Sequence, residues 1–262
     1  MNNKKKDLKN IDNFFSRISN KVRLIPDYLR GYSFSDPVKN GEYKFLREYI
    51  KSGMLVFDIG ANIGEYSRYI LGVDSSVKIH CFEPVKETYD KLVENLRDEI
   101  ITQKVISNNL GLSNENKTEE IFIYGSLAGS NSLYYNKKYV INSVPVMKQV
   151  ICLSTLDEYV SNSGIKKIDL LKIDVEGHEL NVLQGARESL KKNIIKCIQF
   201  EYGDFWKISK SKLFLVFDML KDQYIIYRLT PWGKVKIRRF KTHLENYKYS
   251  NFVAFNKFTS IS

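Results

Sequence analysis

The sequence predicts an α/β domain built on a mostly parallel sheet with helices on both faces. From residue 54 onward, short apolar runs of strand composition alternate with segments of helical periodicity, beginning with the run 54–59. A glycine-containing turn over 60–64 follows that run directly. Strands that alternate with helices form parallel sheets, whose ligands bind at the carboxyl ends of the strands. The residues that follow each strand are therefore the candidate functional residues.

Composition places the chain among ordinary globular proteins. Of its 262 residues, 43% are hydrophobic and 27% are charged, which excludes wholesale disorder and collagen-like repeats. The sequence contains no run of about 18 apolar residues that could span a membrane, and its basic first residues lack the apolar core of a secretory signal. The three cysteines are too widely spaced for a disulfide framework or a metal knuckle. We therefore expect a cytoplasmic protein.

A basic amphipathic extension over residues 1–40 is expected in front of the main domain, which covers 41–262. Apolar residues recur at helical spacing over 8–25, with basic residues between them. Such a helix either contacts an anionic membrane through residues 1–30 or packs against its own domain. The first alternative would make the protein membrane-associated.

Positive charge gathers at both ends of the chain. Residues 1–30 contain eight basic and three acidic residues, and 191–262 contain fifteen basic and five acidic ones. Basic flanks attract nucleic acid, anionic lipid or an acidic substrate. A merely solvated surface is the simpler alternative.

Strands and helices alternate regularly through the first half of the domain. After the first strand, the sequence predicts a helix through Tyr66, a strand over 77–82, a helix over 85–97 and a strand over 104–108. This regular order is typical of a parallel sheet.

A β-rich insertion over 111–150 interrupts this order. It is rich in Asn, Ser and Tyr, and strands are expected at 119–124 and 144–151. After it, the pattern Ser154-x-x-Asp157 predicts the N-terminal cap of a short helix. The remaining expected elements are a strand over 168–173, a helix over 178–191, a strand over 194–200, a helix over 212–221, and strands over 224–229, 235–240 and 252–255, with a turn at 231–233.

An acid and two glycines follow the first strand. Asp58 precedes Gly60 and Gly64, which are arranged as G-x-x-x-G. Gly60 permits a tight turn, and Gly64 lets the next helix start close to the sheet, so that free backbone N–H groups face a ligand. This spacing differs from the GxGxxG fingerprint of dinucleotide-binding proteins, and the acid suits a cationic ligand better than a pyrophosphate. A turn needed only for packing is the alternative.

Polar residues also follow the second and third strands. Glu83 lies 19 residues beyond Gly64, where an acid accepts hydrogen bonds from ribose hydroxyls in nucleotide-binding sheets. Asn109 and Leu110 follow the third strand, where an amide and an apolar side chain suit an adenine ring. An ordinary surface acid and a polar turn are the alternatives.

The densest group of ionisable residues is the segment 172–179, after the fourth strand. It contains Asp174, Glu176 and His178, and Glu201 follows the next strand. Histidine titrates near neutral pH, so His178 is a candidate proton acceptor. The acids either line the cleft or cap the following helix. Asp174 and Glu201 could instead share a divalent cation, because carboxylate oxygens suit Mg²⁺.

Together these motifs resemble the FkbM-type S-adenosylmethionine-dependent methyltransferases. The likeness covers residues 40–255. In one departure, Asn114 stands where the family usually has an acid. The segments that carry the likeness are Asp58-Ile59-Gly60-Ala61-Asn62-Ile63-Gly64, Phe82-Glu83-Pro84, Ser154-Thr155-Leu156-Asp157, residues 171–179 and Leu183-Gln184-Gly185-Ala186.

The resemblance implies a Rossmann-like class I methyltransferase fold, whose seven-stranded sheet has one antiparallel strand, with S-adenosylmethionine as the cofactor. It places the methionine part of the cofactor at the glycine turn, the ribose at Glu83, the adenine at Asn109 and Leu110, and the sulfonium near Asp174. The expected cofactor-binding residues are Asp58, Gly60, Ala61, Asn62, Gly64, Glu83, Pro84, Asn109, Leu110, Asp174 and Glu176.

The resemblance also implies O-methylation, since family members mostly methylate hydroxyl groups on sugars or natural products. The expected partner is a hydroxyl-bearing small molecule or a glycan precursor. A base should remove the hydroxyl proton as the new bond forms. His178 is the first candidate for this base, with Asp174 or Glu201 orienting or replacing it.

Three other functions stay open at this point. A nucleic-acid methyltransferase would use the basic flanks for phosphate contacts, although no Asn-Pro-Pro-Tyr-type loop follows the fourth strand. A non-catalytic peripheral membrane protein would act through residues 1–30. A nicotinamide-dependent oxidoreductase is disfavoured by the G-x-x-x-G spacing.

Overall fold

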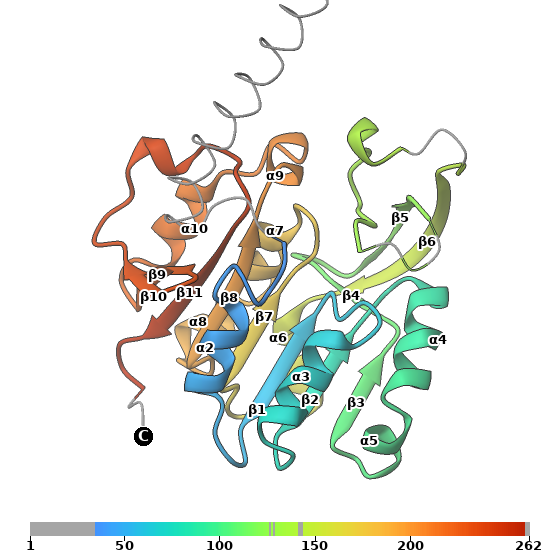
Figure 1. Cartoon of the computed structure of the whole chain (residues 1–262), viewed down its shortest axis with the longest axis horizontal. Coiled ribbons are helices and arrows are strands. Elements are labelled where there is room, and N and C mark those ends of the chain that lie inside the picture. The colour runs from blue at the N-terminus through green and yellow to red at the C-terminus, as the bar shows by residue number, and fades with distance from the viewer. Residues whose placement is uncertain (1–34, 126, 128, 141–143, 260–262) are drawn as a thin grey trace, which may run out of the picture.

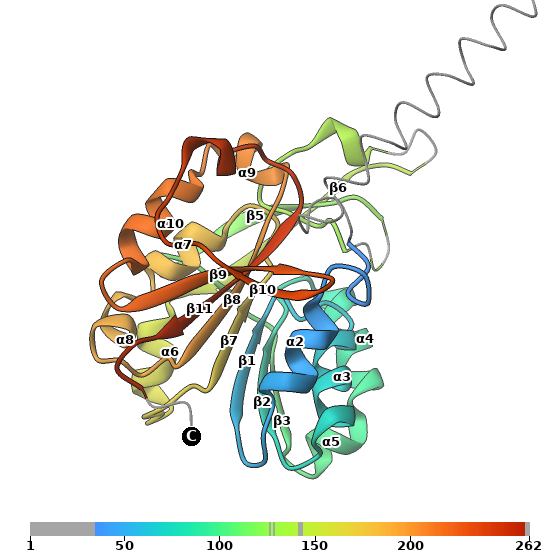
Figure 2. The same cartoon turned by 60° about the vertical axis from the view of Figure 1, so that its left-hand side comes forward.

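The computed structural model describes residues 35–125, 127, 129–140 and 144–259, and Figure 1 shows their arrangement. Within these residues, the central sheet has eight strands in the order β10-β9-β11-β8-β7-β1-β2-β3. Helices cover both faces of this sheet (Figure 2). The fold is therefore the Rossmann-like α/β architecture that the sequence predicts. The helix expected over 8–25 lies outside the described residues.

Five neighbouring parallel strands form the centre of the sheet. β1 pairs with β2 on one side and with β7 on the other, and β3 and β8 flank them. Most side chains of β1, β7 and β8 are buried, as expected for parallel strands covered on both faces. The strands are β1 (Leu55–Ile59), β2 (Lys78–Phe82), β3 (Val105–Asn108), β7 (Leu170–Ile173) and β8 (Cys197–Tyr202).

The C-terminal side of the sheet has one strand more than the resemblance implies. β11 (Ser250–Asn256) is antiparallel to both β8 and β9 (Tyr224–Thr230), and it is the first of two strands that run against the others, where the resemblance implies one. β10 (Gly233–Lys236) adds an eighth strand at the edge, antiparallel to β9. The expected count of seven is one too low, because the turn at 231–233 brings the following residues back beside β9.

Four helices pack on one face of the sheet and join one apolar core with it. They are α2 (Glu42–Tyr49), α3 (Glu65–Val73), α4 (Lys86–Asn95) and α5 (Arg97–Ile101). The opposite face packs in the same way against the helices α6 (Leu156–Asn162), α7 (Glu179–Gln184), α8 (Arg187–Lys191) and α10 (Leu213–Leu220). The short helix α9 (Phe205–Ile208) follows β8. Among the described residues, no helix has the length and apolar character needed to cross a membrane.

The helix expected over 178–191 is divided into α7 and α8 at Gly185. A Cβ atom at this glycine would lie 1.9 Å from the backbone oxygen of Ser113. Only glycine allows such a close approach of two backbone segments. The apolar periodicity runs through both helices, which is why the sequence predicts one helix here.

The cap of α6 lies one residue later than the sequence predicts. Thr155, not Ser154, accepts a 3.1 Å hydrogen bond from the backbone N–H of Glu158. Asp157 instead accepts two hydrogen bonds of 2.8 Å from backbone N–H groups at the start of α8. Ser154 is the last residue of β6, because that strand runs further than the sequence predicts.

A second sheet of three strands is built by the expected β-rich insertion. Its strands are β4 (Gly111–Leu112), β5 (Lys117–Ile123) and β6 (Met147–Ser154), in the order β4-β6-β5. Figure 1 shows β5 and β6 beyond the carboxyl ends of the parallel strands. Its apolar side chains pack against Val85, just after β2. Short 3-10 turns lie at Lys137–Tyr139 and Thr242–Leu244.

Candidate functional site

Two adjoining cavities lie at the carboxyl ends of the parallel strands. The large cavity has a volume of about 560 Å³, and the small cavity has a volume of about 70 Å³. Gly60, Asn62, Gly129, Asp174 and Glu176 line both of them. The two cavities therefore meet where β1 and β7 end, at the position where α/β sheets bind their ligands.

The loop after β1 is shaped by glycines in the left-handed region. The φ angle is 77° at Gly60 and 85° at Gly64, a region that other residues enter only with strain. A Cβ on Gly60 would lie 1.8 Å from the backbone oxygen of Asp174. This loop and the turn after β7 thus touch through their backbones, and Ala61 lines the large cavity. Gly64 faces the core instead, where its Cβ would meet Leu96 at 2.8 Å.

Asp58 lies at the end of β1, below this loop. It is fully buried and accepts a 2.7 Å hydrogen bond from the Ser67 hydroxyl. Burial raises the pKa of this carboxyl. Asp58 lines neither cavity among the described residues, so it acts on the site through its neighbours.

Glu83 connects the end of β2 to the glycine loop. Its carboxylate accepts hydrogen bonds from the backbone N–H groups of Asn62 at 3.1 Å and Val85 at 3.0 Å. Burial raises the pKa of Glu83 to about 7. Glu83 and Pro84 line the small cavity, where the ribose is expected from the sequence.

The residues expected beside adenine lie outside both cavities in the described part of the chain. The Asn109 side chain is exposed and donates hydrogen bonds to the backbone oxygens of Glu83 and Pro84, at 2.9 and 3.0 Å. Leu110 packs against the core. Their adenine contacts stay predictions. The apolar wall of the small cavity is made by Leu112, Ile121, Leu133, Ile151 and Leu153.

A buried lysine lies between two of the acids. The ammonium nitrogen of Lys172 is 3.0 Å from the Asp174 carboxylate and 3.8 Å from the Asp58 carboxylate. It also lies 4.5 Å from the centre of the Tyr66 ring, a favourable position for a cation. Burial lowers the pKa of Lys172, but Asp174 and Asp58 outweigh this and raise it. The lysine therefore stays charged.

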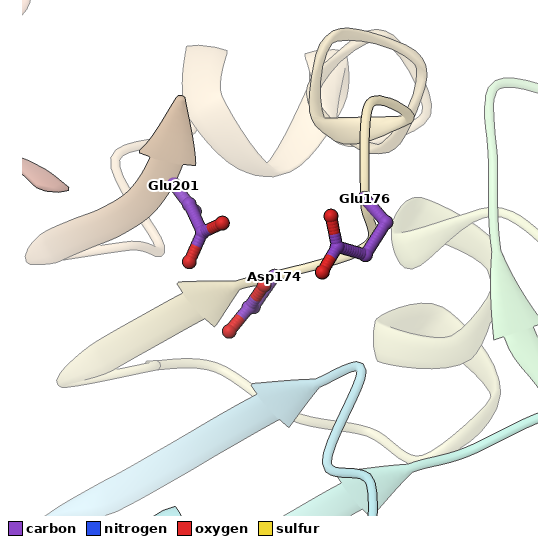
Figure 3. A group of neighbouring side chains, drawn as sticks. All are labelled: Asp174, Glu176 and Glu201. Atoms are coloured by element: carbon purple, nitrogen blue, oxygen red, sulfur yellow. The ribbon is translucent and has the colours of Figure 1, made fainter. Parts of the chain in front are cut away.

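Three carboxylates face one another in the large cavity, as Figure 3 shows. Asp174, Glu176 and Glu201 each place an oxygen within 4.8 Å of the others. Burial, and then the charge of Asp174, raise the pKa of Glu176 and of Glu201 well above the usual range. Such a set could hold a divalent cation, and Glu176 joins the pair that the sequence indicates. The expected sites Asp174 and Glu201 are thus brought together.

His178, the first candidate for the base, lies apart from these acids. It lines the small cavity but not the large one. Its Nε2 and Nδ1 atoms form 2.9 Å hydrogen bonds with the hydroxyls of Ser113 and Tyr134. Burial lowers the pKa of His178 to about 4. Its catalytic role stays a prediction.

The large cavity also contains residues that sequence reasoning missed. Glu42, the first residue of α2, is buried and lines it. Gln199 of β8 donates an amide hydrogen bond to Glu42 and accepts a 2.9 Å bond from the Tyr66 hydroxyl. Tyr249, just before β11, also lines the cavity and hydrogen-bonds Glu201. No motif marks Glu42 or Tyr249, because only the fold brings these distant segments beside β7.

Aromatic side chains line the outer part of the large cavity. The rings of Tyr139 and Phe205 stack with centroids 4.9 Å apart, and Trp206 lies next to them. Lys138 forms an ion pair with Asp204 at the same side. Phe205 and Trp206 are almost fully buried, whereas Tyr139 is partly exposed.

Comparison of the sequence with known protein families shows which family the chain belongs to. Residues 58–224 match the model of the methyltransferase FkbM domain. The chain belongs to the FkbM methyltransferase family. The matched segment contains the glycine loop, Glu83, the acids after β7 and Glu201 near the end of β8, whereas Glu42 and Tyr249 lie outside it.

Several relatives of this FkbM domain carry names that describe methyl transfer. The methyltransferase sdnD of Sordaria araneosa is 31% identical over 172 residues, 56% of this chain and 66% of sdnD. The 2-O-methyltransferase NoeI of Sinorhizobium fredii is 26% identical over 163 residues, 59% of this chain and 65% of NoeI. The hexuronic acid methyltransferase AglP of Haloferax volcanii is 28% identical over 148 residues, 56% of each protein. The chain thus spans two thirds or less of these relatives.

A solved structure supports the fold. The FkbM methyltransferase of Methylobacillus flagellatus has a TM-score of 0.50 and 17% identity, over 90% of this chain and 60% of that one. At this identity the likeness concerns the fold alone.

S-adenosylmethionine is the cofactor of the FkbM family, and the described residues fit it. Gly60 lets the loop after β1 lie directly against the backbone of Asp174, which no side chain would allow. The side-chain oxygen of Asn62 is buried and has no hydrogen-bond partner within the described residues, and this residue lines both cavities. The donors, acids and apolar wall required by a cationic nucleoside are therefore present around the small cavity.

Proposed function

We propose that this protein transfers the methyl group of S-adenosylmethionine to a hydroxyl group of a sugar, a glycan precursor or a natural product. One observation carries the proposal: the small cavity opens at Asp174 into a larger one whose far side bears carboxylates. The names of NoeI and AglP, which describe 2-O-methylation and the methylation of a hexuronic acid, support a hydroxyl-bearing acceptor.

Binding of the cofactor is assigned to the residues around the small cavity. Asn62 and the glycine loop would hold the methionine part, Glu83 the ribose, and the apolar wall the adenine. The cofactor supplies an activated methyl group with a good leaving group already in place. The main task of the protein is then to position the acceptor oxygen in line, an effect that can be worth about 7–11 kcal/mol.

A base in the large cavity completes the reaction. We assign this role to Glu201, because it lies on the acceptor side and its raised pKa makes it a stronger proton acceptor than an ordinary carboxylate. Tyr249 orients it by a hydrogen bond. Asp174 is the second candidate for the base, because its carboxylate already forms an ion pair with Lys172. His178 is disfavoured because both ring nitrogens are hydrogen-bonded and its pKa is lowered.

Calorimetric titration with S-adenosylhomocysteine tests the cofactor assignment. We expect binding to the wild type and at least roughly tenfold weaker binding to Glu83→Ala, which loses the contact to the loop and the expected ribose acceptor. Glu94→Gln, an exposed change on α4, is the control. Failure of the wild type to bind this nucleoside would contradict the proposal.

A labelled-methyl assay over sugars, glycan precursors and polyhydroxylated natural products then identifies the acceptor. The label should appear on an oxygen of the product, as mass spectrometry and NMR would show.

A further inference from the structure

We infer that the acceptor carries a positively charged amino group close to the methylated hydroxyl, and that the carboxylates of the large cavity bind this group. The inference rests on the proposed function, because it names the class of acceptor for the same site. An amino sugar is the simplest molecule that has both groups.

The charges that line the large cavity are strongly unbalanced. Its two lysines are already paired, Lys138 with Asp204 and Lys172 with Asp174. The charge of Lys172 also lowers the pKa of Glu42, but burial outweighs this effect. The acidic residues that line this cavity are Glu42, Glu65, Asp174, Glu176, Glu179, Glu201 and Asp204.

Five of these acids have no ion pair with a basic side chain in the described part of the chain. Among them, Glu42, Glu176 and Glu201 are at least partly buried, whereas Glu65 is exposed. Glu179 differs from them, because its carboxylate accepts hydrogen bonds from backbone N–H groups of the turn after β7. The first three are therefore available to a ligand with positive charge.

The spacing of the inner carboxylates suits an ammonium group. Oxygens of Asp174, Glu176 and Glu201 lie within 4.8 Å of one another. An ammonium donates three N–H bonds at tetrahedral angles, which places acceptors at ordinary hydrogen-bond distance about 4.6 Å apart. One amino group can therefore contact all three acids at once.

Glu42, on α2, is a second feature which indicates that the large cavity binds a cation. It is only 8% exposed, yet it lines the large cavity. Gln199 donates to one of its oxygens, and the other has no hydrogen-bond partner among the described residues. Burial raises the pKa of Glu42 to about 7, so a bound cation would relieve an unfavourable buried charge.

The aromatic side chains of the large cavity also favour a positively charged acceptor. The partly exposed Tyr139 and Tyr249 line it, and aromatic faces attract cations more strongly when water is excluded. An acceptor with a carboxylate would face repulsion from the same surface. We therefore expect this chain to reject a hexuronic acid, in contrast to the acceptor for which AglP is named.

Calorimetry on the full chain saturated with S-adenosylhomocysteine, with EDTA present, tests the inference. The probes are the methyl glycosides of glucosamine, N-acetylglucosamine and glucuronic acid. We expect glucosamine to bind roughly 10- to 100-fold more tightly than N-acetylglucosamine, the range for charge-assisted hydrogen bonds. Glucuronic acid should not bind. Glucosamine binding should also release protons, because a cation lowers the pKa of the buried acids.

A matched pair of variants locates the effect. Glu42→Gln keeps an acceptor for Gln199 but removes the charge, so it should reduce the preference for glucosamine at least severalfold and leave N-acetylglucosamine affinity unchanged. Glu94→Gln should alter neither affinity, because Glu94 is exposed on α4.

Several results would overturn the inference. Equal affinity for glucosamine and N-acetylglucosamine would overturn it, and so would the absence of detectable glucosamine binding. In both cases the protein must still bind S-adenosylhomocysteine and still methylate neutral hydroxyls. Transfer of the methyl group to nitrogen would also overturn it, since the amine would then be the reacting group. Loss of glucosamine binding or of methyl transfer in EDTA, with recovery when Mg²⁺ is added, would assign the carboxylates to a metal. Loss of cofactor binding would instead contradict the proposed function itself.

Discussion

Asp174, Glu176 and Glu201 are neighbouring carboxylates with different surroundings. Asp174 forms an ion pair with Lys172, whereas Glu201 is hydrogen-bonded by Tyr249. Glu176 stands in the left-handed region with φ of 50°, in the turn after β7. Besides the ammonium contact that the three can share, we therefore expect separate roles for two of them: Asp174 next to the cofactor and Glu201 as the base.

Substitution of Glu201 tests this division at the level of one residue. Glu201→Gln should lower kcat by roughly 10²- to 10⁴-fold, the usual effect of losing a general base. Affinity for S-adenosylhomocysteine should stay within about twofold, because Glu201 does not line the small cavity. Steady-state kinetics and calorimetry measure the two quantities.

His178→Gln serves as the comparison, since glutamine can still bond one of the two hydroxyl partners. We expect it to retain most of kcat. A large loss in this variant together with a normal rate for Glu201→Gln would assign the base to His178.

The sequence alone predicted those site residues that directly follow a strand. Glu83, Asp174 and Glu201 come together because parallel strands end at one edge of the sheet. Glu42 could not be predicted, because its place depends on how α2 packs. The hydrogen bonds of His178 could not be predicted either, since Ser113 and Tyr134 reach it from the insertion.

Polar side chains bind the first backbone N–H groups of two helices, α6 and α8. Thr155 caps α6, and Asp157 binds the first N–H groups of α8. One short segment therefore fixes two helices on the same face of the sheet.

Removal of the Thr155 cap tests this arrangement. Thr155→Ala should lower the free energy of unfolding by about 1 kcal/mol, as urea denaturation would show. Ser154→Ala is the matched control and should have a smaller effect, because Ser154 is not the cap. A larger loss in Ser154→Ala would restore the cap position expected from the sequence.

Most strands and helices were predictable from periodicity, because the parallel strands are continuous apolar runs. The exceptions depend on tertiary contacts. The break at Gly185 exists because the backbone of Ser113 approaches it. The strand expected over 235–240 is found earlier, as β10 (Gly233–Lys236), because these residues pair with β9. No sequence motif predicts α2.

At the scale of the whole molecule, buried acids make stability depend on pH. Burial raises the pKa of Glu42 and Glu83 to about 7 and that of Glu179 to about 8, whereas glutamate in an unfolded chain titrates near about 4.3. The native state thus binds more protons than the unfolded state. The free energy of unfolding of the ligand-free protein should therefore fall between about pH 6.5 and 8, by up to about 1.4 kcal/mol per pH unit for each group.

Urea unfolding across this pH range provides the measurement, and Glu83→Gln should flatten the dependence. The buried His80 and His178, whose pKa burial lowers to about 4, do not oppose the trend, because unfolded histidine has largely lost its proton above about pH 6.5. Stability that rises over the same range would show that these acids are ionised in the native state.

The second sheet has a practical consequence. Its side chains, among them Ile121 and Ile151, form part of the wall of the small cavity, while the main sheet carries the acids. Shortening either side chain would make room for a synthetic methyl donor with an enlarged base, and the central framework would stay intact. An enzyme altered in this way could tag its own products selectively among those of its relatives.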